Sequence, residues 1–256
     1  MPAPAAAPAD RIYTAALVVI GDEILSGRTQ DANTAYLAKW LGVQGIRLRE
    51  VRVVADDMTA IADAVNALRV AHDYLFTTGG IGPTHDDITV DAIAAALGVA
   101  VVHHPQAVAI LTEHYGDRIN DARLRMARVP EGAELIANPR TQAPGIRIGN
   151  VFIMAGVPAI TRSMLASLDG QLPGGLPVLT RTIAAWTYES RVAELLASVE
   201  KAHDGIQIGS YPFWREGKTG ANFVLRSVDR VTLDTTASAL IAALAVEGIE
   251  AVDGEL

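Results

Sequence analysis

The sequence predicts an α/β protein with a mostly parallel sheet, followed by a small ferredoxin-like α+β module. Over residues 12–168, short apolar runs of strand length alternate with amphipathic segments of helix length. The segment DGQLPGGLP, residues 169–177, interrupts this alternation and is typical of a linker. The segments after it follow the order strand, helix, strand, strand, helix, strand, which is the split βαβ order. We therefore expect a disordered tail at 1–11, an α/β domain at 12–170 and a small α+β module at 178–256.

The elements of the larger domain follow from their patterns. The run TAALVVIG, residues 14–21, is continuously apolar, as in a strand buried on both faces of a parallel sheet. Residues 46–54 alternate apolar and charged side chains, which predicts a half-exposed strand. Further strands are expected at 74–77, 99–103 and 147–155, and helices at 33–41, 58–72, 89–97, 106–115, 121–128 and 160–168.

The smaller module contains four expected strands and two expected helices. The strands are expected at 178–185, 206–212, 222–228 and 248–252, and the helices at 190–202 and 232–246. Its two tryptophans, Trp186 and Trp214, are expected to pack in the core of the module rather than to stack on a ligand.

Composition narrows the classes of partner. The chain has 21 Lys and Arg against 29 Asp and Glu, a net charge of −8, so nucleic acid is not an expected partner. It contains no cysteine, which excludes disulfides and thiol chemistry and fits a reducing compartment. Neither a signal peptide nor an apolar run of about 18 residues is found, so we expect a cytoplasmic protein without a membrane partner.

The most informative motif is TTGGIGPTHDDIT, residues 77–89, at the junction of a strand and a helix. Glycines there allow close approach of backbone to ligand, and the free N–H groups at a helix start attract phosphate. In an open parallel sheet, ligands bind beyond the carboxyl ends of the strands, where this loop lies. The motif matches neither a P-loop, which needs a lysine, nor a dinucleotide fingerprint, since His85 replaces the third glycine.

Carboxylates follow three strands of the expected sheet, at Asp22 and Glu23, at Asp56 and Asp57, and at Asp86 and Asp87. Two adjacent carboxylates would repel a phosphate unless a cation lay between them. Mg²⁺ is commonly held by one or two carboxylates plus phosphate oxygens, so Asp56, Asp86 or Asp87 are candidate metal ligands. The alternative is that each Asp caps a helix, which stabilises a protein by about 1 kcal/mol.

Other polar residues carry weaker signals. The adjacent His103 and His104 fit a loop at a strand end better than a metal site, whereas His85 fits phosphate contact and solvent exposure equally well. The arginines Arg123, Arg125 and Arg128 fit a solvated helix face better than a patch that steers an anionic substrate.

These motifs together resemble the molybdopterin-binding family, which includes MogA, MoaB and the N-terminal domain of CinA-type proteins. The loop at 77–89, the opening GDEILSG at 21–27 with Asp31 and Asn33, and VRVVADD at 51–57 carry the resemblance. It covers about residues 12–167. Residues 206–212 resemble the small module that follows this domain in CinA-type proteins and in the molybdopterin-binding half of eukaryotic FAD synthases.

The resemblance implies a three-layer α/β fold that binds a pterin or an adenine nucleotide with a divalent metal such as Mg²⁺, Mn²⁺ or Co²⁺. It further implies a homo-oligomer. MogA-type members adenylylate molybdopterin, whereas CinA-type members are linked to hydrolysis of ADP-ribose and the FAD synthase half to hydrolysis of FAD. The acidic pair at 86–87 is similar to the CinA-type branch, so hydrolysis of a nucleotide pyrophosphate is the expected function. Molybdopterin adenylylation and binding without catalysis are the alternatives.

The implied site has three groups of residues. The expected catalytic residues are Asp56 and Asp87, and the expected metal ligands are Asp56, Asp86 and Asp87. The expected substrate- and phosphate-binding residues are Gly79, Gly80, Ile81, Gly82, Pro83, Thr84, Gly21, Asp22, Glu23 and Asn33.

The sequence departs from the CinA-type pattern at two places. Thr141 and Gln142 replace the Gly and Thr of N-x-x-G-T-A-P-G, and AGVPAIT, residues 155–161, lacks the Glu of PGVP-x-EM. These changes put in question whether these two segments, which we expect at the rim of the site, keep the chemistry of CinA-type proteins. The resemblance ends before the nicotinamide-mononucleotide deamidase domain of CinA-type proteins, so that activity is not expected.

Overall fold

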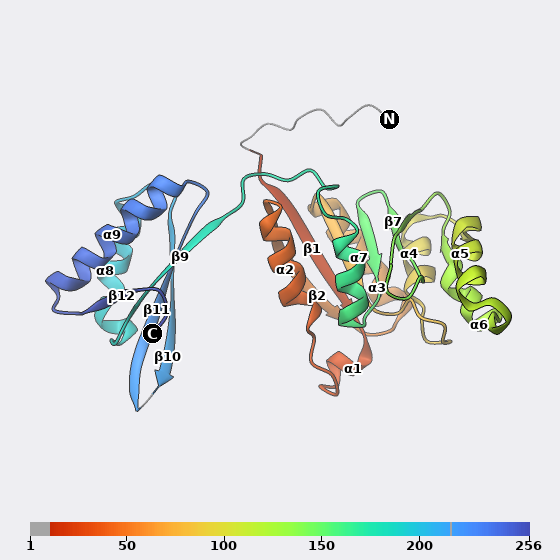
Figure 1. The fold of residues 1–256 in the computed structure, drawn as a ribbon, viewed down its shortest axis with the longest axis horizontal. Coiled ribbons are helices and arrows are strands. Elements are labelled where there is room, and N and C mark those ends of the chain that lie inside the picture. Colours follow the sequence, from red (N-terminus) through yellow and green to blue (C-terminus); the bar gives the residue numbers. More distant parts are fainter. Residues whose placement is uncertain (1–10, 216) are drawn as a thin grey trace. The chain divides into compact units, whose positions relative to one another are not determined.

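The computed structural model describes residues 11–215 and 217–256, which form two compact units (Figure 1). The first unit ends at Leu176 and the second begins at Pro177. The disordered tail expected at 1–11 lies outside the described residues apart from Arg11, which pairs with Asp73.

The first unit contains a six-stranded sheet, helices and a smaller two-stranded sheet. Its strands are β1 (Tyr13–Ile20), β2 (Ile46–Val54), β3 (Tyr74–Thr78), β4 (Val101–His103), β5 (Arg128–Pro130), β6 (Glu134–Ile136), β7 (Gly145–Ile148) and β8 (Val151–Met154). Its helices are α1 (Asp22–Leu25), α2 (Asn33–Val43), α3 (Met58–Ala71), α4 (Thr89–Leu97), α5 (Pro105–Tyr115), α6 (Asp121–Leu124) and α7 (Pro158–Ala166), with 3-10 turns η1 (Gly116–Arg118) and η2 (Arg125–Ala127).

The large sheet has the order β2-β1-β3-β8-β7-β6. The pairs β2-β1, β1-β3 and β3-β8 are parallel, while β7 is antiparallel to both β8 and β6. The predicted mostly parallel α/β sheet is therefore confirmed. One strand was predicted wrongly, because residues 147–155 form a hairpin of β7 and β8 that turns at Gly149, where φ is 57°.

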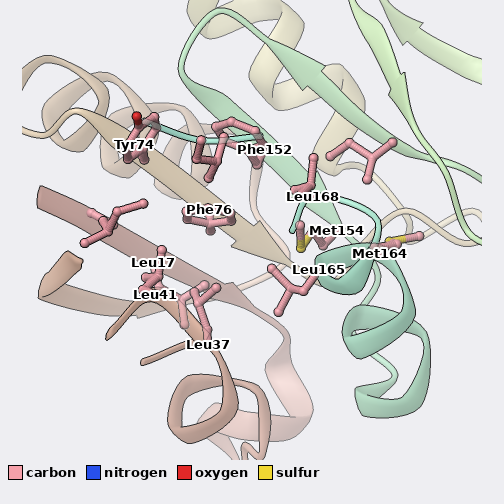
Figure 2. Packing of buried hydrophobic residues seen from close by; sticks show 14 of the residues in the cluster. Leu17, Leu37, Leu41, Tyr74, Phe76, Phe152, Met154, Met164, Leu165 and Leu168 are labelled. Atoms are coloured by element: carbon pink, nitrogen blue, oxygen red, sulfur yellow. The ribbon is translucent and has the colours of Figure 1, made fainter. Parts of the chain in front are cut away.

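Side chains from the two faces of this sheet enter two separate cores, which makes the unit three-layered. On one face, Leu37 and Leu41 of α2 and Leu165 of α7 pack against the strands (Figure 2). There the rings of Phe76 and Phe152 stack with centroids 4.9 Å apart. On the other face, α3 and α4 supply buried side chains such as those of Ile61, Val65, Leu68 and Ile93.

A smaller substructure lies between α4 and β6. Strands β4 and β5 pair with each other outside the large sheet, and α5 packs on η2 through Leu111 and Ala127. The helix expected over 121–128 ends at Leu124, because the chain then turns through η2 into β5. The segment after Leu124 therefore faces other parts of the unit instead of forming a solvated helix face.

The segment expected to be a linker, residues 169–177, is largely exposed but is attached to the first unit at Leu172, Pro173 and Gly175. The Tyr74 hydroxyl donates a hydrogen bond to Pro173 O (2.7 Å), and the Gly175 N–H donates to Gly45 O (3.2 Å). Leu172 is buried with the α2–α7 core. The boundary between the two units falls between Leu176 and Pro177.

The second unit has the predicted ferredoxin-like plan. Its elements are β9 (Leu179–Ala185), α8 (Glu189–Lys201), β10 (Gln207–Arg215), β11 (Lys218–Ser227), α9 (Arg230–Val246) and β12 (Ala251–Asp253). The strand order is β10-β11-β9-β12, all antiparallel, and α8 and α9 bury Val192, Leu233 and Leu240 against it. The prediction for the two tryptophans was wrong, since Trp186 is 38% and Trp214 71% exposed.

Among the described residues, no helix is long and apolar enough to cross a membrane.

Candidate functional site

The candidate site lies at the carboxyl edge of the four parallel strands. Gly21 follows β1, Asp56 follows β2 after one residue, Gly79 follows β3, and Gly156 follows β8 after one residue. Parallel strands bring these positions to one edge, where open α/β sheets bind ligands. The Gly21 N–H donates to Val54 O (3.1 Å) and the Gly79 N–H to Met154 O (3.1 Å), so the four strand ends are directly linked.

The glycine-rich loop after β3 has a backbone that only glycine fits. At Gly79 φ is 107°, and an added Cβ would lie 2.1 Å from Ile20 O. At Gly80 φ is 65°, and a Cβ would lie 2.2 Å from Thr89 Oγ1. The Thr89 hydroxyl donates to Gly79 O (2.9 Å) and its N–H donates to Gly80 O (3.1 Å), which anchors the loop to the start of α4.

Three consecutive amides of this loop are open. Across residues 11–215 and 217–256, no protein acceptor receives the N–H of Gly80, Ile81 or Gly82. Adjacent free N–H groups form a site for an oxyanion, because each donates to a negatively charged oxygen. The geometry of the loop therefore fits its predicted role in phosphate binding.

Asp87 folds back onto this loop. Its Oδ2 accepts hydrogen bonds from the N–H (2.8 Å) and the hydroxyl of Thr84, while its Oδ1 accepts none from the described residues. An added Cβ at Gly82 would lie 2.6 Å from Asp87 Oδ2, so the glycine makes room for the carboxylate. Asp87 is thus held in one orientation with one oxygen left for a ligand.

Asp56 has a comparable arrangement at the end of β2. Its Oδ2 accepts the N–H of Asp22 (3.0 Å), and its Oδ1 has no hydrogen-bond donor among the described residues. Burial raises the pKa of Asp56, the Asp22 N–H opposes this, and the negative charges of Asp22, Glu23 and Asp86 raise the pKa further. A concentration of negative charge of this kind is favourable for a bound cation.

The neighbouring Asp57 has a structural role. Its Oδ1 accepts the N–H groups of Thr59 (3.0 Å) and Ala60 (2.8 Å), which makes it the N-cap of α3. The capping alternative therefore holds for Asp57 but not for Asp56.

Asn33 supports the site from behind. It is 6% exposed, and its Nδ2 donates to Gly156 O (2.8 Å), which ties the start of α2 to the turn after β8. Asp31 accepts the Asn33 N–H (2.9 Å) and so holds this residue in place. Gly156 in turn approaches the loop closely, since its Cβ position lies 3.2 Å from Gly79 Cα.

A cleft of about 650 Å³ lies beside the glycine loop. Its floor includes Gly80, Ile81, Gly82, Pro83 and Asp87, with Glu23 at one side. The walls come from α5, α6 and η2, from the β6–β7 loop, and from the turn after β8 with the following helix α7. They are Tyr115, Arg123, Met126, Asn138, Thr141, Ala143, Pro144, Ala155, Gly156, Val157, Pro158, Ile160 and Met164.

The predicted site residues fall into three settings. Five of the predicted loop and carboxylate positions line the cleft together with Glu23, as described above. Asp56 and Asp86 belong to the acidic group near Asp22, outside the cleft lining. The remaining residues, Gly21, Asp22, Asn33, Gly79 and Thr84, shape or anchor the loops.

Sequence reasoning missed the cationic wall of the cleft. Arg123 lines the cleft and stacks over the Tyr115 ring at 4.5 Å, and Arg125 and Arg128 line a small adjoining pocket with Gly82. The solvated-face interpretation of this cluster was therefore wrong. The mixture of arginine with apolar residues at 123–128 was a signal that this segment is partly buried.

The histidines are peripheral. His85 is exposed at the tip of the loop, outside the cleft lining. His103 ends β4, and His104 precedes α5 at its N-cap position.

The acidic residues fit a divalent cation only in part. In the part of the chain that the structure describes, no group of three or more His, Asp or Glu side chains could hold a metal ion. Asp56 and Asp87 nevertheless each present an oriented carboxylate with a free oxygen, and Mg²⁺ needs only one or two carboxylates when phosphate oxygens and water complete its shell. The assignment of Asp56, Asp86 and Asp87 as metal ligands stays a prediction.

Open amides on a strand-to-helix loop, at the carboxyl edge of a parallel sheet and beside a cleft, are typical of α/β domains that bind phosphate-bearing small molecules. Comparison with known families agrees with this class. The family described as "Probable molybdopterin binding domain" matches residues 16–173, and "FAD synthase, middle domain" matches residues 177–253. The chain belongs to the molybdopterin-binding domain family.

Individual relatives support this assignment. The protein Ta0487 of Thermoplasma acidophilum is 32% identical over 205 residues, covering 77% of this chain and 80% of the relative. A CinA-like protein of Syntrophus aciditrophicus is 33% identical over 216 residues, and the match spans 78% of this chain but only 51% of that relative. A crystal structure of the protein CinA from Thermoplasma acidophilum superimposes with a TM-score of 0.58 at 33% identity, over 62% of this chain and 98% of that one.

Proposed function

We propose that this chain hydrolyses the pyrophosphate bond of a nucleotide of the ADP-ribose or FAD type, with a divalent metal. The observation that carries the proposal is the row of open amides at Gly80, Ile81 and Gly82, which lies in a cleft beside the oriented carboxylate of Asp87. The amides suit the phosphates, and the mostly apolar walls of the cleft suit the planar ring of a nucleotide.

The residues of the chain have separate roles in this proposal. The loop amides bind phosphate oxygens and hold the pyrophosphate in one orientation, while Asp56 and Asp87, with Asp86, hold the metal through their free oxygens. A bound divalent metal supplies charge stabilisation at phosphoryl oxygens and activates water. Water adds at one phosphorus and the bridging P–O bond breaks, so each half leaves with one phosphate.

The similarity of residues 177–253 to the FAD synthase middle domain supports a flavin nucleotide as one candidate substrate. The acidic pair Asp86 and Asp87 favours hydrolysis over adenylylation of molybdopterin, because Asp86 adds negative charge near Asp56 where a cation would be needed.

Binding without catalysis is a second candidate function, which the rim of the cleft favours. Thr141 lines the cleft where the family pattern has glycine, and Gln142 has a φ of 65°, the only positive φ of a non-glycine residue in the described chain. The site could thus bind a nucleotide or pterin in an altered pose.

The test is incubation of the purified protein with ADP-ribose, FAD or NAD, each with Mg²⁺, Mn²⁺ or Co²⁺, followed by chromatography for AMP. We expect AMP from at least one pair, and we expect Asp87→Asn to lower its rate by about a hundredfold or more while the protein stays folded. Asp117→Asn, at an exposed position outside the cleft lining, is the matched control. Ligand binding without AMP from any pair would favour the binding-only function.

A further inference from the structure

Arg125, the first residue of η2, lacks the partners that the neighbouring arginines have. Its Nε is buried and makes no hydrogen bond with any described residue. Arg128 pairs with Asp91, and Arg123 donates to Arg118 O while it stacks on Tyr115. The described ion pairs do not include Arg125. A buried N–H group without an acceptor destabilises a fold, and a bound ligand oxygen would satisfy the Arg125 Nε–H.

The surroundings of Arg125 indicate what that ligand is. Arg125 lines a small pocket together with Asp87 and with Ile81 and Gly82, two of the three loop residues whose amides are open. The pocket holds about 10 Å³, which is close to the space that one oxygen-sized group occupies. Residues with open donors, Ile81 and Gly82 of the loop and Arg125 of η2, therefore line the same small space.

The charge of Asp87 gives Arg125 a role in anion binding. Its carboxylate faces both the cleft and the small pocket, and alone it would repel an anion. The positive charge of Arg125, which lines the same pocket, offsets that repulsion, and a guanidinium also offers two parallel N–H donors to a phosphate.

We propose that Arg125 is a second phosphate-binding residue of this site, so that the cleft selects ligands with a diphosphate over those with a single phosphate. The amides of Gly80, Ile81 and Gly82 bind one phosphate, and the other phosphate places an oxygen in the small pocket, where Arg125 donates to it. The inference shares with the proposed function only the requirement that the ligand carries phosphate; it does not need hydrolysis to occur.

The test compares Arg125→Gln with the unaltered protein by calorimetric titration with inorganic pyrophosphate, ADP-ribose and AMP, without metal and with Mg²⁺. Arg118→Gln is the matched control, because Arg118 is exposed and does not line either pocket. We expect Arg125→Gln to weaken binding of pyrophosphate and ADP-ribose about tenfold or more, to weaken AMP binding less, and to leave the unliganded melting temperature the same or higher.

The outcomes separate this inference from the proposed function. Equal affinities for pyrophosphate in Arg125→Gln and Arg118→Gln would overturn the role of Arg125, even if the protein hydrolyses a nucleotide. A lower melting temperature with unchanged affinity would show a structural role and would also overturn it. Loss of diphosphate affinity in a protein that releases no AMP would support the inference while the proposed hydrolysis fails.

Discussion

Asp56 and Asp57 are neighbours in the sequence, yet the structure gives them different roles. Asp57 stabilises the first turn of α3, whereas burial, together with the nearby acidic side chains, raises the pKa of Asp56. Because its folded pKa is raised, the folded state binds a proton more readily than the unfolded chain. This residue therefore lowers stability as pH rises from about its ordinary value through its folded pKa, and the loss persists at neutral pH.

Asp56→Asn removes this charge and keeps an oxygen that accepts the Asp22 N–H. We expect the variant to be at least as stable as the unaltered protein at neutral pH, with the difference vanishing in acid, and to lose metal-dependent turnover. Thermal unfolding across a pH series and the AMP assay measure the two effects. If Asp56→Asn were less stable than the unaltered protein at neutral pH but equally stable in acid, the Asp56 charge would be stabilising, which contradicts its raised pKa.

Asp57→Ala is the matched control for this substitution. Loss of the cap should lower the free energy of unfolding by about 1 kcal/mol without changing turnover, because the Asp57 carboxylate is engaged by the first N–H groups of α3 and has no role in the proposed metal site. Equal loss of turnover in the Asp56→Asn and Asp57→Ala variants would mean that turnover depends on the integrity of α3 and not on the Asp56 carboxylate.

At the scale of elements, two of the three glycines in the β3–α4 loop, Gly80 and Gly82, are required for different reasons. Gly80 has a positive φ, and a Cβ there would clash with Thr89, so the backbone conformation itself requires glycine at this position. Gly82 has no such φ, and a Cβ there would displace only the carboxylate of Asp87.

Gly80→Ala should therefore destabilise the fold by about 1–3 kcal/mol, whereas Gly82→Ala should change stability by less than about 1 kcal/mol. Gly82→Ala should nevertheless weaken nucleotide binding, because Asp87 and an open amide both move. Urea unfolding and titration with ADP-ribose measure the two effects. If the Gly82→Ala protein folds and binds ADP-ribose as tightly as the unaltered protein, the observed orientation of Asp87 is not required for binding.

The elements that the sequence predicted correctly are those set by local patterns. Strand β1 and helix α3 follow from an apolar run and from a helical stripe with a cap, which depend only on nearby residues. Helix α6 was predicted four residues too long, because residues 128–130 pair with β4, a contact about 27 residues distant that no periodicity encodes. The β7–β8 hairpin was missed because only residues 149 and 150 separate the two strands, so that the end of β7 and the apolar strand β8 resemble one continuous strand.

The same distinction applies to the candidate site. The loop and its carboxylates were identifiable from the sequence, since glycine and aspartate at a strand end have a direct chemical meaning. Arg125 was not, because its environment depends on how η2 lies against a loop more than thirty residues away, and the sequence shows only that several arginines are close together.

At the scale of the whole molecule, the chain forms two units with separate cores, and each matches a different family description. The end of the first unit is not at the start of the proline- and glycine-rich segment but at Leu176. Residues 171–176 contribute buried surface from Leu172 and hydrogen bonds to Pro173 and Gly175.

A truncated chain that ends at Leu176 should therefore unfold cooperatively, and one that ends at Gly170 should be less stable by about 3 kcal/mol. The estimate combines burial of one leucine, about 2 kcal/mol, with two hydrogen bonds of about 0.5–1 kcal/mol each. Urea denaturation followed by circular dichroism gives both values. Equal stability of the two fragments would mean that the segment contributes nothing to the first unit.

The glycines of that segment have a practical consequence for anyone who splices other proteins into this chain. A side chain at Gly174 would meet Gln44 O at 1.8 Å, and one at Gly175 would meet Arg11 O at 2.4 Å. Although its composition is typical of a flexible linker, this segment does not tolerate a side chain at Gly174 or Gly175. A fusion or tag should therefore be attached just after Leu176.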